Sequence, residues 1–201
     1  TETLKATTLG HCADGICPII EIEKIKAFGR EHFADTINNA VDQVLLNNLV
    51  IAPEEEPDIK TLDQALEHFI SSYRVYKSDF PEAGTEYEIN STSQVSYNGA
   101  QLLSIKFENY TYWGGAHGYG STTYLNFDKD AETSLNNEAL FKDYTGFLKL
   151  AETQFRNQKK LSAEENINST GFYFENDVFA LPNAIGFTEN EMVLVYNPYE
   201  I

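Results

Sequence analysis

The sequence predicts an α+β fold made of two packed subdomains, with an antiparallel sheet that carries helices on one side. Two observations support this prediction. Apolar residues recur at spacings of three and four between residues 31 and 80, as in amphipathic helices, and they alternate between residues 87 and 127, as in strands. Helices and strands do not alternate strictly along the chain, so a doubly wound parallel sheet is disfavoured. The change of period places the boundary between the two parts within residues 84–98.

The first half of the chain is expected to contain one short strand and two helices. Residues 16–22, ICPIIEI, are rich in β-branched residues and predict the strand. The first helix starts at Glu31, and its apolar face consists of Phe33, Ile37, Val41, Val44, Leu45 and Leu49. The second helix begins at Thr61, because Thr61 and Gln64 form a capping-box pattern, and it ends before Pro81.

The middle of the chain predicts a β-hairpin with its turn at Asn98 and Gly99, a pair that strongly favours tight turns between strands. A strict two-residue turn would send the apolar residues of the return strand, within 103–107, to the face opposite Val95. A three-residue loop with a bulge would bring both apolar sets to one side. Since register follows the buried face, we predict the bulged form, with Tyr97 on the same face as Val95.

The second half is expected to contain a glycine-rich loop, a third helix and further short strands. Residues 110–119, YTYWGGAHGY, interrupt the alternation with three glycines. The later elements are expected as an alternating strand at 123–127, a turn at 128–130, a helix at 144–155 and short apolar segments at 172–174, 185–187 and 192–196. The last of these segments is predicted to be a buried strand.

The chain is strongly acidic, with 31 Asp and Glu residues against 14 Lys and Arg residues and a formal net charge of -17. This charge would repel nucleic acid, so we exclude DNA and RNA as partners. It would attract a cationic protein, although the same charge can serve solubility alone. No apolar run approaches the roughly 18 residues that span a bilayer, so no transmembrane segment is expected.

The two cysteines, Cys12 and Cys17, flank the turn-forming pair Asp14 and Gly15. This spacing favours a disulfide between them, which would place the domain in an oxidising compartment. Two alternatives stay open: a pair of thiols, and a metal site that uses His11 with both cysteines. The metal site would need a fourth ligand that the sequence does not supply, so we expect no metal.

Segments of the second half resemble the signatures of a bacterial envelope family, DUF3298. Residues 112–118, YWGGAHG, and 125–128, LNFD, are similar to its GGAH and NFD motifs, and residues 196–201, YNPYEI, are similar to its Y-x-P-Y-E-I run. The segment from Cys17 through the first helix is similar to the companion domain DUF4163. The resemblance implies a tether at residues 1–12, a DUF4163-like subdomain at 13–90 and a DUF3298-like subdomain at 91–201.

The resemblance also implies where the protein works and what it does. Members are secreted, lipid-anchored or extracytoplasmic parts of membrane proteins, so we expect an extracytoplasmic domain, with room for a lipid anchor upstream. Relatives include an anti-sigma factor ectodomain that senses lysozyme and the non-catalytic part of peptidoglycan deacetylases, whose catalysis belongs to a separate domain. We therefore expect a non-catalytic binding domain that recognises a lysozyme-like cationic protein or a cell-wall glycan. Because the family continues past its Y-x-P-Y-E-I run, we expect the protein to extend beyond Ile201.

The glycine-rich loop is the best candidate for a ligand site. Its glycines permit close backbone approach, and aromatic residues surround it. The candidate ligand-binding residues are Tyr112, Trp113, Gly114, Gly115, His117, Tyr119 and, from the C-terminal signature, Tyr199. The alternative is architectural: a tight crossover whose aromatic residues belong to the core and whose histidine caps a carbonyl, beside a packed strand end.

No motif marks catalysis or a cofactor. The sequence has no G-x-S-x-G, H-E-x-x-H, G-x-G-x-x-G or Walker pattern, so we expect no catalytic residue and no cofactor. His117 is the only one of the four histidines in a suggestive setting, and Asp128 could orient it if the loop folds back. Two further functions stay open: a glycan hydrolase that uses His117 or Asp128, and a structural module of a larger envelope protein.

Overall fold

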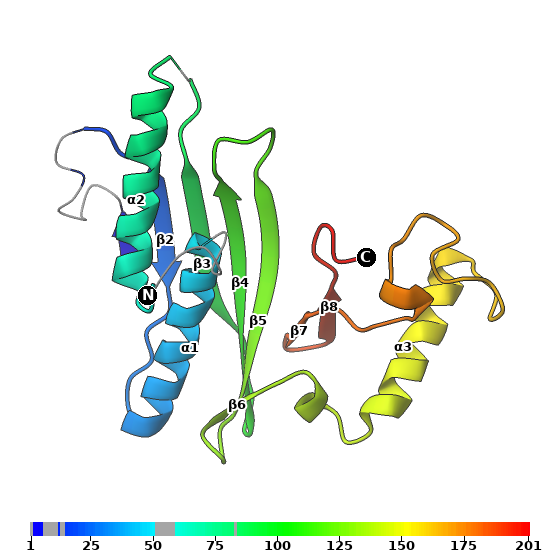
Figure 1. Ribbon diagram of the computed structural model, residues 1–201. Coiled ribbons are helices and arrows are strands. Elements are labelled where there is room, and N and C mark those ends of the chain that lie inside the picture. The colour runs from blue at the N-terminus through cyan, green and yellow to red at the C-terminus, as the bar shows by residue number, and fades with distance from the viewer. Residues whose placement is uncertain (1, 6–11, 13–14, 51–58, 83) are drawn as a thin grey trace.

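The computed structural model describes residues 2–5, 12, 15–50, 59–82 and 84–201 (Figure 1). The described part has the predicted α+β class, with a six-stranded sheet in the order β1-β2-β3-β4-β5-β6, a two-stranded sheet of β7 and β8, and three α-helices. The elements are β1 (Glu2–Lys5), β2 (Ile19–Lys24), α1 (Glu31–Leu49), α2 (Leu62–Asp79), β3 (Glu88–Asn98), β4 (Leu102–Tyr112), β5 (Tyr119–Asp128), β6 (Thr133–Leu135), α3 (Tyr144–Lys159), β7 (Ala184–Phe187) and β8 (Met192–Val195).

The six-stranded sheet is mixed, whereas an antiparallel sheet was predicted. β2 pairs with β3 in parallel, because the chain leaves β2, passes through α1 and α2, and returns alongside β2 in the same direction. Residues 2–5, which fall within the predicted tether, form the edge strand β1 and pair antiparallel with β2. β2 begins at Ile19, after Pro18, and not at residue 16. Proline lacks the N–H that a ladder needs, whereas the N–H of Ile19 bonds the carbonyl of Tyr87 at 2.8 Å.

Helices α1 and α2 cover one face of the sheet and form the main core with it (Figure 1). The predicted face of α1 is confirmed, since Phe33, Ile37, Val41, Leu45 and Leu49 are all buried. The predicted start of α2 is confirmed as well. The Thr61 side chain accepts the N–H of Gln64, and the Gln64 side chain accepts the N–H of Thr61, which satisfies two donors at the start of the helix.

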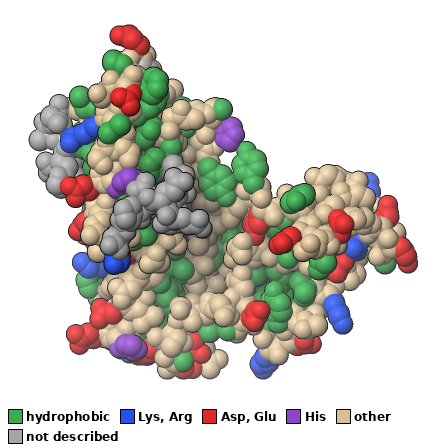
Figure 2. Space-filling view, viewed as in Figure 1, with side chains coloured by type: hydrophobic (Ala, Val, Ile, Leu, Met, Phe, Trp, Pro, Cys, Tyr) green, Lys and Arg blue, Asp and Glu red, His purple; other side chains and the backbone are tan. Residues whose placement is uncertain are grey.

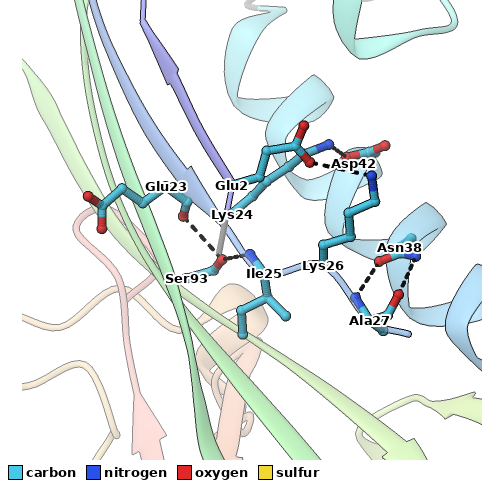
Figure 3. Close-up of polar contacts among 9 residues, drawn as sticks. All are labelled: Glu2, Glu23, Lys24, Ile25, Lys26, Ala27, Asn38, Asp42 and Ser93. Carbon is cyan, nitrogen blue, oxygen red and sulfur yellow. Dashed lines mark hydrogen bonds and ion pairs between the residues drawn. The ribbon is translucent and has the colours of Figure 1, made fainter. Parts of the chain in front are cut away.

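The segment that leaves β2 is held against α1 by polar side chains (Figure 3). The Asn38 side chain accepts the N–H of Ala27 at 2.8 Å and donates to the carbonyl of the same residue at 3.2 Å. One helical turn further on, Asp42 forms an ion pair of 2.7 Å with Lys24 at the end of β2. These contacts set the position of α1 over the sheet at the point where the chain turns from strand to helix.

The β3–β4 hairpin contains a bulge, but it lies within β3, between Val95 and Tyr97, and not at the predicted turn: Asn98 still pairs with Leu103, and the N–H of Gly99 bonds the carbonyl of Leu102 at 2.9 Å. Val95 lies opposite Ile105, but the register shifts between Val95 and Tyr97, so Tyr97 lies opposite Ser104. The extra residue turns Tyr97 to the face away from the helices, where its ring lies 6.4 Å from that of Phe187 in β7. The expectation that Tyr97 shares the face of Val95 was therefore wrong, because the bulge falls between these two residues.

The C-terminal part packs against the face of the sheet opposite the helices. Asn126 of β5 donates to the carbonyl of Ile185 at 2.8 Å, and the N–H of Phe187 bonds the side chain of Ser104 at 3.2 Å. Gly186 lies so close to the ring of Tyr124 that a methyl group there would overlap it. The six-stranded sheet continues across residues 84–98, and the two apolar clusters divide the chain after Phe127.

The second apolar cluster is small and largely aromatic. Its buried residues are Leu161, Ile167, Phe174 and Phe179, and the rings of Phe155, Phe172 and Tyr196 pack against them. No residue of α3 is fully buried, and β8 is only half-buried, so the prediction of a buried strand at residues 192–196 was wrong. Residues 172–174 do not form a strand: Phe172 and Phe174 pack into the cluster, and Tyr173 is exposed. The second cluster is too small to bury both α3 and β8 completely.

The close packing of Gly186 on Tyr124 yields a test of the contact between β5 and β7. Replacing Gly186 with Ala should lower the free energy of unfolding by about 1–3 kcal/mol, because the new methyl group meets the ring. Adding Tyr124→Ala should recover part of that loss. Gly120→Ala is the matched control, since the nearest atom to its new methyl group lies 3.9 Å away. Urea denaturation measures all four proteins, and equal losses for the two single glycine variants would contradict the packing.

A second test concerns Tyr196, whose hydroxyl donates to the carbonyl of Ala180 at 2.6 Å. Burial, and then the charge of Glu200, raise the pKa of Tyr196 above its ordinary value of 10.0. The folded state thus favours the neutral phenol. Its contribution to stability is complete below pH 10 and is lost as the pH rises past that value toward the folded pKa.

Stability should therefore fall between about pH 9 and pH 11, and Tyr196→Phe should make that fall shallower. Part of the slope of stability against pH should remain in the variant, because the pKa values of Tyr73, Tyr87 and Tyr124 are also raised. Tyr173→Phe is the control, because Tyr173 is exposed. Chemical denaturation at each pH is the measurement, and a Tyr196→Phe slope as steep as that of the parent protein would refute the assignment.

Candidate functional site

The glycine-rich loop between β4 and β5 lies beside the last residues of the chain. The hydroxyl of Tyr199 is 3.4 Å from Nε2 of His117, although 82 positions separate the two residues. The hydroxyl of Tyr119 reaches the carbonyl of Pro198, also at 3.4 Å. The structure thus brings together two segments that the sequence marks separately, the loop and the YNPYEI run.

Asn197 joins the C-terminal run to the edge of the sheet. β6 pairs with β5 only at Asn126–Asp128, so the earlier part of β5 has an open edge. There the Asn197 side chain accepts the N–H of Thr122 at 2.7 Å and donates to the carbonyl of Thr122 at 3.0 Å. One amide side chain thereby pairs with both backbone groups of Thr122, as a neighbouring strand would, and protects the edge.

Glu200 and the backbone of Tyr199 complete the turn. The carboxylate of Glu200 accepts the N–H of Asn183 at 2.6 Å and the N–H of Asn197 at 2.8 Å. Tyr199 has a φ of 67°, in the left-handed region that bulky residues rarely adopt. Its ring projects from the surface and is 81% exposed. The surrounding hydrogen bonds therefore hold a strained backbone that presents an aromatic ring to solvent.

Three rings form an exposed aromatic platform, which we define as His117, Tyr119 and Tyr199. The ring of Tyr199 stacks on each of the other two with centroid distances of 6.4 Å and interplanar angles of 20°. Nδ1 of His117 lies 3.0 Å from the carbonyl oxygen of Gly118. Because a carbonyl only accepts, Nδ1 carries the proton in the neutral ring, and Nε2 accepts from the Tyr199 hydroxyl.

The inner part of the predicted site belongs to the core. Trp113 is half-buried and meets Phe69 of α2 edge-on, with ring centroids 4.6 Å apart. Gly114 has a φ of 79°, and a Cβ there would come within 3.0 Å of the ring of Tyr87. The hydroxyl of Tyr112 donates to the carbonyl of Gly115 at 2.8 Å, which closes the loop on itself. The seven candidate residues thus divide into an outer platform and an inner support.

A groove of about 430 Å³ opens beside the platform, and we call it the loop groove. Its lining residues come from the end of α1, from β4 and from the loop: Asn47, Asn48, Val50, Thr111, Trp113, Gly115, His117 and Tyr119. None of them is an acid, a lysine or an arginine. The groove therefore offers aromatic faces, amides and a hydroxyl, a combination suited to an uncharged polar ligand.

Asn48 adds an unsatisfied donor to the wall of this groove. Its Nδ2 is buried and has no hydrogen-bond acceptor in the part of the chain that the structure describes. Such a donor costs about 1–3 kcal/mol. Sequence reasoning missed Asn47 and Asn48, because polar residues at the end of an amphipathic helix give no functional signal. Asn197 could have been found, since it lies inside the YNPYEI signature.

The structure does not bring Asp128 to His117. Asp128 ends β5 while the loop precedes it, and nine steps of about 3.3 Å along a strand separate Asp128 from Tyr119 by about 30 Å. Oδ1 of Asp128 accepts the N–H groups of Asp130 and Ala131 and so forms the predicted turn. The idea that Asp128 orients His117 is therefore wrong, because the extended strand keeps them apart.

Within the described residues, no three His, Cys, Asp or Glu side chains gather as a metal site would require, and no helix is long and apolar enough to cross a membrane. The predicted disulfide is not formed. Sγ of Cys17 instead donates to the carbonyl of Cys12 at 3.1 Å, so the structure describes the reduced pair and the covalent link stays a prediction. His11, which the metal alternative invoked, lies outside the described residues.

Two family models match consecutive parts of the chain. The model described as "Deacetylase PdaC" matches residues 19–119, which include the glycine-rich loop, although the sequence resemblance had assigned that loop to DUF3298. The model described as "Protein of unknown function (DUF3298)" matches residues 131–201, which include the YNPYEI run. The aromatic platform therefore draws His117 and Tyr119 from the first match and Tyr199 from the second. No curated protein matches the chain.

Two solved structures of DUF3298 family proteins share the fold. The protein from Pseudomonas aeruginosa is 19% identical with a TM-score of 0.60, and the match covers 100% of this chain and 83% of the other. The protein from Bacteroides fragilis is 19% identical with a TM-score of 0.52, and the match covers 85% of this chain and 70% of the other. At this identity the likeness concerns the fold alone.

The pairing of Asn197 with Thr122 predicts the effect of removing the amide. Asn197→Ala should lower the free energy of unfolding by about 1–2 kcal/mol and should speed hydrogen exchange at the Thr122 amide, because that N–H loses its acceptor. Asn190→Ala, in the exposed β7–β8 turn, is the control. Nuclear magnetic resonance follows the single amide, and unchanged protection of Thr122 in the Asn197 variant would contradict the pairing.

Proposed function

The chain belongs to the Deacetylase PdaC family and carries a DUF3298 region in its C-terminal part, and on this premise we propose that it is a non-catalytic binding domain of the bacterial envelope. Its ligand is a cell-wall glycan, and the site is the loop groove together with the aromatic platform. The matched models cover residues 19–119 and 131–201, so both halves of this site lie in the parts that define the family.

The observation that carries this proposal is the exposed stack of rings beside an uncharged groove. Sugar rings present C–H groups on their faces and hydroxyls on their edges. Tyr119 and Tyr199 offer ring faces to the former, while Asn47, Asn48 and Thr111 offer amides and a hydroxyl to the latter. The unsatisfied Nδ2 of Asn48 supports the same class of ligand, because a sugar hydroxyl or acetamido oxygen accepts a hydrogen bond.

The family name refers to a deacetylase, and we assign this chain a binding role within that family. Among the described residues that line the loop groove there is no carboxylate, and His117 uses both ring nitrogens in contacts with Gly118 and Tyr199. General acid–base catalysis needs a group free to exchange a proton with the substrate. These features favour a domain that holds glycan while chemistry occurs elsewhere, and they disfavour the hydrolase alternative.

A cationic protein such as lysozyme is a second candidate, favoured by one observation. The net charge of -17 would steer a basic protein to the domain, and Figure 2 shows acidic side chains spread over the visible face of the molecule. This contribution fades with salt, because screening shortens the range of charge interactions to about 8 Å at physiological ionic strength. Binding in the uncharged groove should depend little on salt, so ionic strength separates the two candidates.

The platform predicts the effect of removing one ring. Tyr199→Ala should weaken binding of soluble peptidoglycan fragments by about 1–2 kcal/mol with little change in the melting temperature, because the ring packs on the exposed rings of His117 and Tyr119 and not on the core. Tyr173→Ala is a matched control, since Tyr173 and Tyr199 are both 81% exposed and only Tyr199 belongs to the platform beside the groove. Isothermal titration calorimetry at low and high salt, with lysozyme as a parallel titrant, gives the affinities.

The results of these titrations distinguish the proposed glycan site from the alternatives. Fragment binding that is insensitive to salt and weakened only by Tyr199→Ala supports the glycan site. Lysozyme binding that disappears at high salt and ignores Tyr199 would move the function to the acidic surface. Fragment binding that is equal in both tyrosine variants would rule out the platform as the site.

A further inference from the structure

A second groove, of about 730 Å³, lies in the C-terminal part between α3 and β8, and we call it the α3 groove. One wall is the apolar stripe of α3, which includes Phe147, Leu150, Ala151 and Phe155. The other wall includes Leu194, Val195, Tyr196 and Ile201. Leu150 is 56% exposed, and no residue of α3 is fully buried, so the stripe faces the groove largely uncovered. Figure 2 shows hydrophobic side chains open to solvent on this part of the molecule.

The groove also contains an open strand edge. β8 pairs with β7 along one side, and in Figure 1 it lies between β7 and α3. No backbone group of Met192–Val195 makes a hydrogen bond outside the pairing with β7, within the residues that the structure describes. Every second residue of a strand directs its N–H and C=O groups to the outer side. An apolar edge with unpaired backbone groups is a template for another strand.

Lys159 provides a charge at one end of the α3 groove. Its Nζ lies 5.3 Å from the ring centroid of Phe172 and 5.9 Å from that of Phe155, and the ring of Phe155 lies 6.3 Å from that of Tyr196. Among the described residues no carboxylate pairs with Lys159, although the chain holds 31 acidic residues. The groove is therefore complementary to an occupant that is apolar along its length and acidic at one end.

We propose that the α3 groove binds an extended polypeptide segment, which adds as a third strand to the open edge of β8. Alternate apolar side chains of the segment lie on the α3 stripe, and a carboxylate of the segment pairs with Lys159. The dimensions agree with this occupant. The lining residues of α3 run from Phe147 to Lys159, a distance of about 18 Å along the helix, which a strand of about five or six residues matches.

The unpaired edge favours a peptide over a lipid. An acyl chain would fill the apolar space and could place a carboxylate at Lys159, but it has no groups to pair with the backbone of β8. A peptide satisfies the edge, the stripe and the charge together, in the manner of strand addition to an exposed sheet edge. The site is on a different part of the chain from the loop groove, so this proposal stands apart from the glycan function.

The test uses synthetic peptides of eight residues that alternate threonine and valine and carry a glutamate at one end, in two versions with the glutamate first or last. Fluorescence anisotropy of the labelled peptides with the whole chain measures affinity. The better version should bind saturably. Methylating the backbone nitrogens on one edge of that peptide should weaken binding about tenfold or more, because those N–H groups can no longer pair with β8.

Two protein variants locate the peptide. Leu150→Glu should weaken binding about tenfold or more, while the matched control Val75→Glu, at a 62% exposed position on α2, should leave it unchanged. Lys159→Ala should abolish the preference for the glutamate peptide over its glutamine counterpart. Circular dichroism melting checks that each variant remains folded, as expected for substitutions at exposed positions.

Four results would overturn the proposal. Equal binding of the methylated peptide would rule out pairing with the edge of β8. Displacement of the peptide by decanoate, with higher affinity than the peptide, would make the groove an acyl site. Concentration-dependent dimers that Leu150→Glu dissociates, without peptide binding, would assign the groove to a second copy of the chain. Binding that Leu150→Glu leaves intact would place the peptide elsewhere.

Discussion

Strand β5 is the element on which the rest of the structure depends, because each of its faces and its open edge has a separate task. One face directs Phe127 into the core beneath the helices, where it is fully buried. The other face receives β7, through Asn126 and the ring of Tyr124 against Gly186. The open edge pairs with Asn197. A strand alternates its side chains between two faces, so one ten-residue segment can serve both halves of the molecule.

The candidate site arises where the protection of that edge ends. Asn197 closes the edge at Thr122, and the chain then turns over the start of β5 with Tyr199 in a strained conformation. The strain is held by Glu200, whose carboxylate accepts two backbone N–H groups. The glycine-rich loop meets this turn from the other side because Gly114 can pack directly on Tyr87. The pairing of Asn197 with the sheet edge and the tight turn of the glycine-rich loop together place the rings of the aromatic platform at the surface.

Local patterns in the sequence predicted the elements, and contacts between distant residues decided the site. The periodicity of α1, the capping box at Thr61 and the bulge in the hairpin all follow from interactions within a few residues. The parallel pairing of β2 with β3 does not, because it depends on where two helices return the chain. The loop and the YNPYEI run could each be marked from sequence, but no local rule states that Asn197 would pair with Thr122, 75 positions away. For the same reason the sequence could not separate Trp113, which packs on the core and lines the groove, from Tyr119, which belongs to the exposed platform.

The net charge acts on a ligand over a longer distance than direct contacts do. Binding in the loop groove, as proposed, would depend on the short-range contacts. A net charge of -17 would oppose approach to an anionic polymer, so long-range attraction would not supply the affinity for the proposed glycan if it lies among such polymers. Screening confines the repulsion to about 8 Å at physiological ionic strength. Inside that distance, stacking on rings and hydrogen bonds to amides depend little on charge, and they can hold a neutral sugar against a repulsive background. The described lining of the loop groove carries no charge on a strongly acidic domain, and this supports the proposal of a binder whose specificity comes from contact geometry and not from electrostatic steering.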